Sequence, residues 1–157
     1  MRKILLALLL VFAASAAGAA DLSRGQTIYV PVYSHVAHGN LDSSGKPWTL
    51  PLSVMLSIRN IDPASGLTVR AVRYYDTEGK LLREFYAEPK KLAPLQSTDV
   101  FVENKDMTGG SGANFLVVWD ADSPVNPPIV EAVHAYFFGN QSVVFTTIGR
   151  VVETVAK

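Results

Sequence analysis

The stretch Leu52-Ser53-Val54-Met55-Leu56-Ser57-Ile58-Arg59 decides the fold class, because an aliphatic side chain stands at every second position along it. Alternation with a period of two is typical of a β-strand that buries one face. The four aliphatic side chains at the even-numbered positions therefore face a core, and the side chains between them face outward.

The same alternation continues through the chain after residue 20, and no segment shows a convincing helical period. It predicts further strands at 27–33, 68–75, 81–86, 98–103, 114–119, 129–138 and 142–148. Turn residues separate them, with a glycine closing 76–79 and a tight Gly139-Asn140 hairpin. About eight such strands favour an antiparallel, immunoglobulin-like β-sandwich, and a closed barrel is the alternative.

The side-chain pattern also predicts which strands are central. Segment 114–119 is apolar on both faces, and so is 129–138 apart from Glu131 and His134, so both are expected inside a sheet. Pro31 cannot donate a ladder hydrogen bond, which favours an edge position for 27–33.

Residues 1–20 have the features of a secretory signal peptide. Arg2 and Lys3 precede an apolar run, and Ala17-Gly18-Ala19 fits a cleavage site, so cleavage is expected after Ala19 or Ala20. The apolar run, 4–14, is shorter than the roughly 20 residues that a membrane anchor needs. We expect residues 21–157 to form one domain, located in the bacterial periplasm or secreted.

Charge and cysteine content narrow the function classes. Without Arg2 and Lys3, 12 basic residues remain against 14 acidic ones, a net charge of −2, which argues against nucleic acid or anionic lipid as the main partner. The chain contains no cysteine, so it has no disulfides, thiolate metal ligands or lipid-anchored cysteine.

Several motifs together resemble a bacterial exported family known as domain of unknown function 3124. The resemblance covers nearly the whole chain after residue 20 and implies an envelope protein, but it transfers no catalytic residue. The motifs are 28–35 (IYVPVYSH), 56–60 (LSIRN) with Asp62-Pro63, 74–77 (YYDT), 109–115 (GGSGANF) and 126–129 (NPPI).

The strongest indication of a metal site in the sequence is the pair His35 and His38. Two imidazoles three residues apart converge on one ion only if the segment turns, and a third ligand would have to come from His134 or Asp42. On an extended strand the two rings would point to opposite faces. A periplasmic metal-binding protein is therefore the alternative function.

The glycine-rich segment from Gly109 through Gly110, Ser111 and Gly112 to Asn114 lacks the features of a phosphate loop and of a nucleophile elbow. No Lys-Ser/Thr pair follows it, and a strand is expected where both motifs need a helix. It is either a tightly curved approach to a strand or a backbone-mediated contact site.

Carboxylates do not form a recognisable site either. Segment 120–126 has Pro and Val where an EF-type calcium loop needs a ligand and glycine. Asp99 and Glu103 share a strand face without indicating an acid–base pair or a hydrolase. No cofactor is expected.

Tyr29 and Tyr33 lie on the face opposite the aliphatic residues of the strand predicted at 27–33. An edge strand with exposed aromatics can bind a partner strand or a sugar ring. The sequence thus predicts a non-enzymatic binding or assembly module whose partner is an envelope protein or a glycan, with these tyrosines and the glycine-rich segment as contact surfaces.

Overall fold

A computed structural model describes residues 21–154, and the predicted signal peptide lies outside these residues. The described chain contains twelve strands and no helix, so no helix in it is long enough to span a membrane. The strands are β1 Ser23–Pro31, β2 His35–Leu41, β3 Pro47–Pro51, β4 Ser53–Arg59, β5 Leu67–Tyr75, β6 Leu81–Glu84, β7 Lys90–Leu92, β8 Ser97–Val102, β9 Asn114–Val125, β10 Ile129–Phe138, β11 Gln141–Ile148 and β12 Arg150–Thr154.

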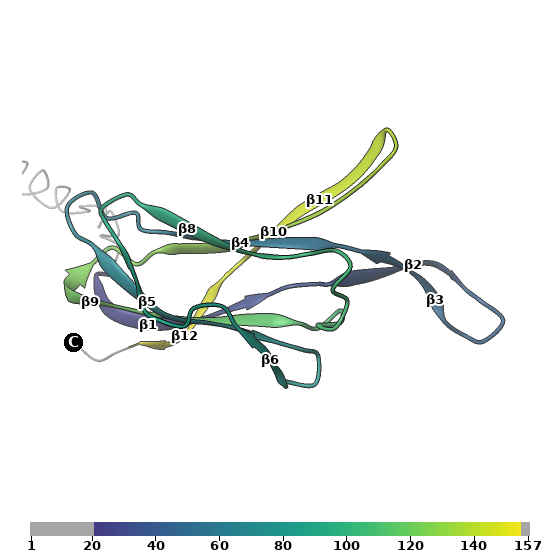
Figure 1. Ribbon diagram of the computed structural model, residues 1–157, viewed down its shortest axis with the longest axis horizontal. Helices are drawn as coiled ribbons and strands as arrows, with labels where there is room; N and C mark the ends of the chain where they lie inside the picture. Colours follow the sequence, from purple (N-terminus) through teal and green to yellow (C-terminus); the bar gives the residue numbers. More distant parts are fainter. Residues whose placement is uncertain (1–20, 155–157) are drawn as a thin grey trace, which may run out of the picture.

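Two antiparallel sheets form the body and face each other across one core (Figure 1). The first has the order β12-β1-β9-β5-β6, with β7 also paired to β5, and the second has the order β11-β10-β4-β8. Aliphatic and aromatic side chains from both sheets fill the space between them, including the fully buried Trp119, Tyr74 and Phe115.

The strands predicted from alternation are present. Val54, Leu56 and Ile58 on β4 are completely buried, as the opening stretch predicts. The prediction that 114–119 and 129–138 are central is also confirmed, because β9 lies between β1 and β5 and β10 lies between β11 and β4. The Gly139-Asn140 turn joins β10 to β11, with Phe138 paired to Gln141.

The edge position predicted for 27–33 is wrong. β1 pairs with β12 on one side and β9 on the other, so it is an interior strand. Pro31 is compatible with this place because β12 stops pairing at Tyr29, two residues before the proline. The missing N–H therefore falls where β1 has a neighbour on one side only.

Four strands were not predicted, and each lacks the pattern that reveals the others. β2 and β3 form a hairpin, a separate two-stranded sheet in which no side chain is fully buried and most are exposed. β7 is three residues long, and β12 is exposed throughout. None of the four therefore shows buried and exposed side chains in alternation, and β7 buries only Leu92.

Gly149 takes the chain from one sheet to the other between β11 and β12. Its N–H donates to the carbonyl of Val130 at 2.9 Å, and a Cβ at this position would lie 2.6 Å from the Ile28 side chain. Only glycine fits so close an approach, so the crossing point between the layers depends on this residue.

Candidate functional site

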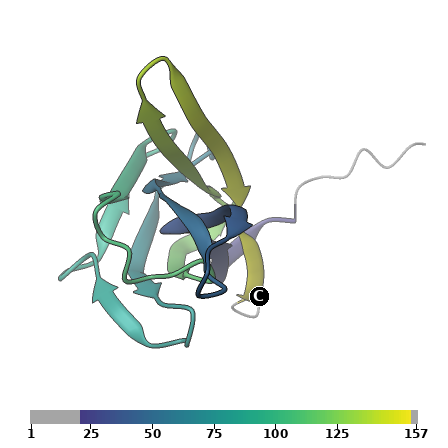
Figure 2. The same cartoon turned by 90° about the vertical axis from the view of Figure 1, so that its right-hand side faces the viewer.

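The β10–β11 hairpin extends beyond the sheet to which it belongs (Figures 1 and 2). β10 pairs with β4 only as far as Ala135, whereas it pairs with β11 as far as the turn. The part of the hairpin beyond Ala135 carries Tyr136, Phe137 and Phe138, and Phe137 is 73% exposed. No Asp, Glu, Lys or Arg occurs between Glu131 and Arg150. The hairpin is thus an uncharged, partly aromatic projection.

Among the described residues, β11 pairs with β10 alone, so one side of its backbone is free. Hydrogen-bonded and non-hydrogen-bonded pairs alternate along an antiparallel ladder. The bond from Gly149 to Val130 fixes the phase of this alternation. It follows that the free side carries the N–H and C=O groups of Ser142, Val144, Thr146 and Ile148.

The other edge strands of the two facing sheets differ from β11 in ways that discourage pairing. β8 is interrupted by Asp99, β6 has four residues that include Arg83 and Glu84, and β12 has five that include Arg150 and Glu153. Short length and charge are the usual means by which proteins protect a sheet edge. β11 has eight residues, no charge, no proline and a regular register with β10.

The outward face of this sheet adds apolar surface next to the free edge. Phe101 on β8 pairs with Met55 on β4, and Met55 pairs with Val133 on β10. Val144 on β11 is 55% exposed and pairs with Ala135, which is two residues beyond Val133 on β10 and on the same face. Directly paired residues share a face, so Phe101, Met55 and Val133 form an apolar strip across β8, β4 and β10, and Val144 on β11 lies diagonally next to its end.

Aromatic packing supports β11 from the inside. The buried ring of His134 stacks on Phe145, its partner across the ladder, and Tyr33 contacts both rings edge-on. His134 Nε2 accepts a hydrogen bond from the Tyr33 backbone N–H at 3.1 Å. Burial lowers the pKa of His134 to about 4, so the imidazole is neutral and able to accept this bond. Thr147 Oγ1 also donates to the Pro31 carbonyl at 2.6 Å.

The three histidines of the predicted metal site do not converge. His134 is buried between the sheets, whereas His35 and His38 lie on the projecting β2–β3 hairpin. His38 packs edge-on against Trp48 of β3 instead. No group of three His, Cys, Asp or Glu side chains within residues 21–154 is arranged to hold an ion, so the metal-binding alternative is not supported.

The glycine-rich segment is held from within the fold. Gly109 accepts hydrogen bonds from the Thr77 backbone N–H and hydroxyl, and the Gly112 N–H donates to the same hydroxyl. The buried Ser34 donates to the carbonyls of Met107 and Gly110. A Cβ on Gly109 would lie 1.9 Å from the Tyr74 hydroxyl, so the glycine permits tight packing. Ser111 is exposed beside them, and Asn114 begins β9. These contacts account for the segment as a structural loop.

The remaining predicted positions also take part in local structure. Tyr29 is half-buried within β1, opposite Leu116 of β9. Asp42 accepts hydrogen bonds from the backbone of Ser44 and Lys46 in the β2–β3 turn, which lowers its pKa. The segment 120–126 lies largely in the extended strand β9, and Asp120 pairs with Arg70 at 2.7 Å.

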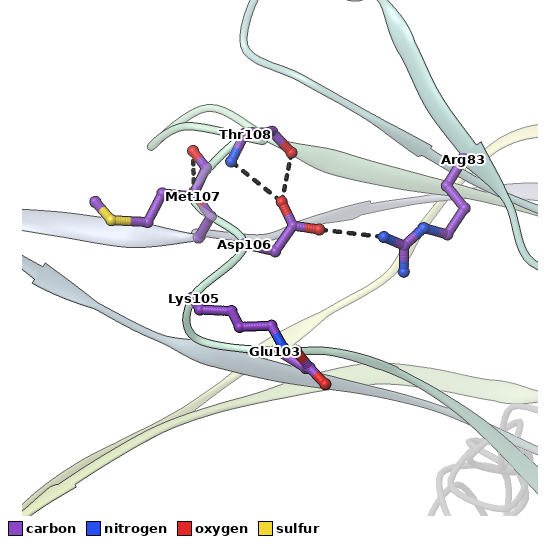
Figure 3. Close-up of polar contacts among 7 residues, drawn as sticks. Arg83, Glu103, Lys105, Asp106, Met107 and Thr108 are labelled. Carbon is purple, nitrogen blue, oxygen red and sulfur yellow. Dashed lines mark hydrogen bonds and ion pairs between the residues drawn. The ribbon is translucent and has the colours of Figure 1, made fainter.

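A hollow of about 560 Å³ lies where β6 approaches the loop after β8 (Figure 3). Its charged side chains are paired with one another: Arg83 with Asp106 at 3.3 Å and Lys105 with Glu103 at 2.5 Å. Thr108 donates a further bond to Asp106. The charges thus balance within the hollow, which gives it little attraction for an ion.

Sequence reasoning missed the free edge of β11. The strand itself was predicted, but its place at the edge depends on which strands pair in three dimensions. The one signal available in the sequence is the absence of charge between Glu131 and Arg150, which is unusual for an exposed hairpin.

Comparison with known proteins identifies the family. A crystal structure titled Thermotoga maritima 1070 is similar, with 12% sequence identity, coverage of 83% of this chain and 97% of that chain, and a TM-score of 0.45. No curated protein matches significantly. The family model described as "Protein of unknown function (DUF3124)" matches residues 25–152. The chain therefore belongs to the DUF3124 family.

Proposed function

We propose that this protein is an exported, non-enzymatic binding or assembly module that takes up a partner strand at the free edge of β11. The observation that carries the proposal is an eight-residue edge without charge, proline or irregular register. Exposed strands of this kind bind extended segments through backbone hydrogen bonds, and neighbouring side chains provide selectivity.

The surroundings of the edge favour a protein as the partner. Four residues of β11 direct their backbone N–H and C=O groups to the free side. Another strand can pair with all of these groups in a regular ladder, whereas a glycan cannot. Val133 and Val144, the apolar side chains of the outward face that lie nearest the edge, would contact alternate side chains of the incoming segment. The rings of His134, Phe145 and Tyr33 pack together beneath β11 and support it from the core side.

The sequence supports export and an envelope location. Residues 1–20 have the pattern of a signal peptide, and the resemblance to an exported bacterial family agrees with it. A cysteine-free domain with a well-packed core needs no oxidative folding step outside the cytoplasm. We propose the periplasm or the cell exterior as the location, and an immunoglobulin-like relation for the two facing sheets.

A binding role is also favoured over catalysis because the polar groups of the two other candidate regions are bonded within the fold. The glycine-rich segment uses its backbone groups on Thr77 and Ser34, and the charged hollow beside β6 is internally neutralised. The exposed features of the molecule are instead apolar side chains and a strand edge.

Photo-cross-linking in cells that make the protein tests this function. A photoreactive amino acid replaces Val144 at the edge, and a matched control carries it at Phe101 on the opposite edge of the same sheet; the two positions are 55% and 52% exposed. We expect a discrete cross-linked species from position 144, identified by mass spectrometry, that position 101 does not give. Equal or absent cross-linking from both positions would contradict the proposal.

A further inference from the structure

We propose that the strand taken up by β11 is β11 of a second copy of this chain. The two strands pair antiparallel about a two-fold axis, so that the four-stranded sheets of both copies join into one continuous sheet. This inference rests on the proposed function, because it names the partner of the same edge.

The backbone of β11 is suited to pairing with itself. A two-fold axis through Phe145 places Val144 opposite Thr146 of the second copy, and Ser142 opposite Ile148 of the second copy. These are the residues whose N–H and C=O groups point to the free side, so every one of them enters a hydrogen-bonded pair. The regular register of β11 leaves no bulge to interrupt this ladder.

The lack of charge on β11 also favours a copy of the same strand. A two-fold axis brings equivalent residues of the two copies close together, so a charged strand would repel itself. β11 has no Asp, Glu, Lys or Arg, and its pairs would be valine with threonine and serine with isoleucine. The other edges of the two facing sheets carry charges that a two-fold axis would place near their own equivalents.

Self-pairing also brings exposed apolar side chains into common rows on the outward face. One row runs from Ala135 through Val144 to Thr146 and Val133 of the second copy. Another runs from Ile148, which is 70% exposed, to Ser142 and Phe137 of the second copy, with only the small serine between the two apolar residues. The pairing thereby covers apolar surface that the single chain leaves in water.

Neither a lipid surface nor an unrelated peptide fits these features as closely. The β10–β11 hairpin has no lysine or arginine to attract anionic headgroups. An unrelated segment could use the edge, but only an identical strand is certain to match its length and alternation at all four outward residues.

The oligomeric state tests the pairing. The chain is expressed with its own N-terminal residues, and the mass of the purified protein is measured by light scattering and sedimentation over a dilution series. We expect a dimer at micromolar concentration. Val144→Lys should raise the dissociation constant at least about tenfold, because it places a charge in the paired strand. Phe101→Lys, at a similarly exposed position on the far edge, should leave the dissociation constant unchanged.

A second variant checks the backbone contribution. Thr146→Pro removes an N–H that points to the free side, so the ladder between β10 and β11 keeps its bonds. The variant should be a folded monomer by circular dichroism and sedimentation. In the unmodified chain, hydrogen exchange at Val144 and Thr146 should slow as the protein concentration rises.

The possible outcomes separate the two proposals. A monomer at every concentration, or equal effects of Val144→Lys and Phe101→Lys, would overturn the self-pairing. If the self-pairing is overturned but position 144 still cross-links to another protein, the proposed function stands with a different partner. If position 144 gives no cross-link either, both proposals fail.

Discussion

The imidazole of His134 lies parallel to the ring of Phe145, with 4.4 Å between the ring centroids and 4° between the planes. The two residues are direct partners across the β10–β11 ladder, and His134 also binds the backbone N–H of Tyr33 after β1. One buried histidine thus connects the edge strand pair to the chain leaving the facing sheet. Four predictions concern such buried contacts.

Because of His134, the free energy of unfolding should decrease as the pH is lowered. Its folded pKa, about 4, is below the value of 6.5 for an unperturbed histidine, so the unfolded chain binds more protons between these values. The contribution is therefore complete above about pH 6.5 and is lost as the pH falls toward 4, by about 3 kcal/mol in total. Urea unfolding at several pH values measures this loss.

His134→Gln provides the control for that experiment. Glutamine does not titrate in this range, so the variant should be less stable at neutral pH but should show a shallower decline between pH 6.5 and 4. Parallel pH curves for the two proteins would show that other groups cause the decline.

Removing the hydroxyl of Tyr74 should not harm the fold. The Tyr74 side chain is buried, and its oxygen has no hydrogen-bond partner within the described residues. Burial raises the pKa of this group to about 12. Tyr74→Phe is therefore expected to be neutral or to stabilise by up to about 1 kcal/mol, since an unpaired buried polar group is removed. Thermal unfolding measures the change, and a large loss would indicate a hidden partner.

The loop before β9 should depend on Thr77. Its hydroxyl donates to the Gly109 carbonyl and accepts from the Gly112 N–H. Thr77→Val preserves the shape of the side chain but removes both bonds, so we expect a loss of about 1–2 kcal/mol. Denaturant unfolding provides the value. Thr108→Val, whose hydroxyl bonds to an exposed carboxylate, is the control and should lose less.

Gly149→Ala should weaken the crossing between the sheets. The new methyl group would lie 2.6 Å from Ile28 and 3.0 Å from the Val130 carbonyl, and backbone cannot move aside easily. A cost of roughly 1–3 kcal/mol is expected for such overpacking. Gly45→Ala, which meets no atom within 4 Å, is the comparison for the effect of a methyl group without a clash. Equal unfolding midpoints for the two variants would contradict the role of close packing at Gly149.

The sequence predicted the strands that bury a face, because burial and alternation have the same cause. Val54 and Ile58 could be placed in the core from their spacing alone. The β2–β3 hairpin buries almost nothing, so its sequence had no comparable signal. Pro31 led to the wrong prediction of an edge strand because β12 is missing as a neighbour only at the end of β1, where the proline lies.

The candidate site was harder to predict than the fold. The exposed edge of β11 arises because β10 pairs with β4 on its other side and no strand within residues 21–154 pairs with the free side of β11. Local spacing in a sequence does not reveal which distant segments pair. The predicted tyrosines illustrate the same limit. Tyr33 packs against His134 and Phe145, residues more than a hundred positions away in the chain.

The pairing of β1 with β12 has a consequence for the order of folding. Thr27 and Glu153, 126 positions apart, hydrogen-bond across these two strands, which are the first and last described. During synthesis, β1 emerges long before β12 and at first lacks this neighbour. The first sheet can therefore be completed only when the chain as far as β12 is free, which makes its completion a late step of folding.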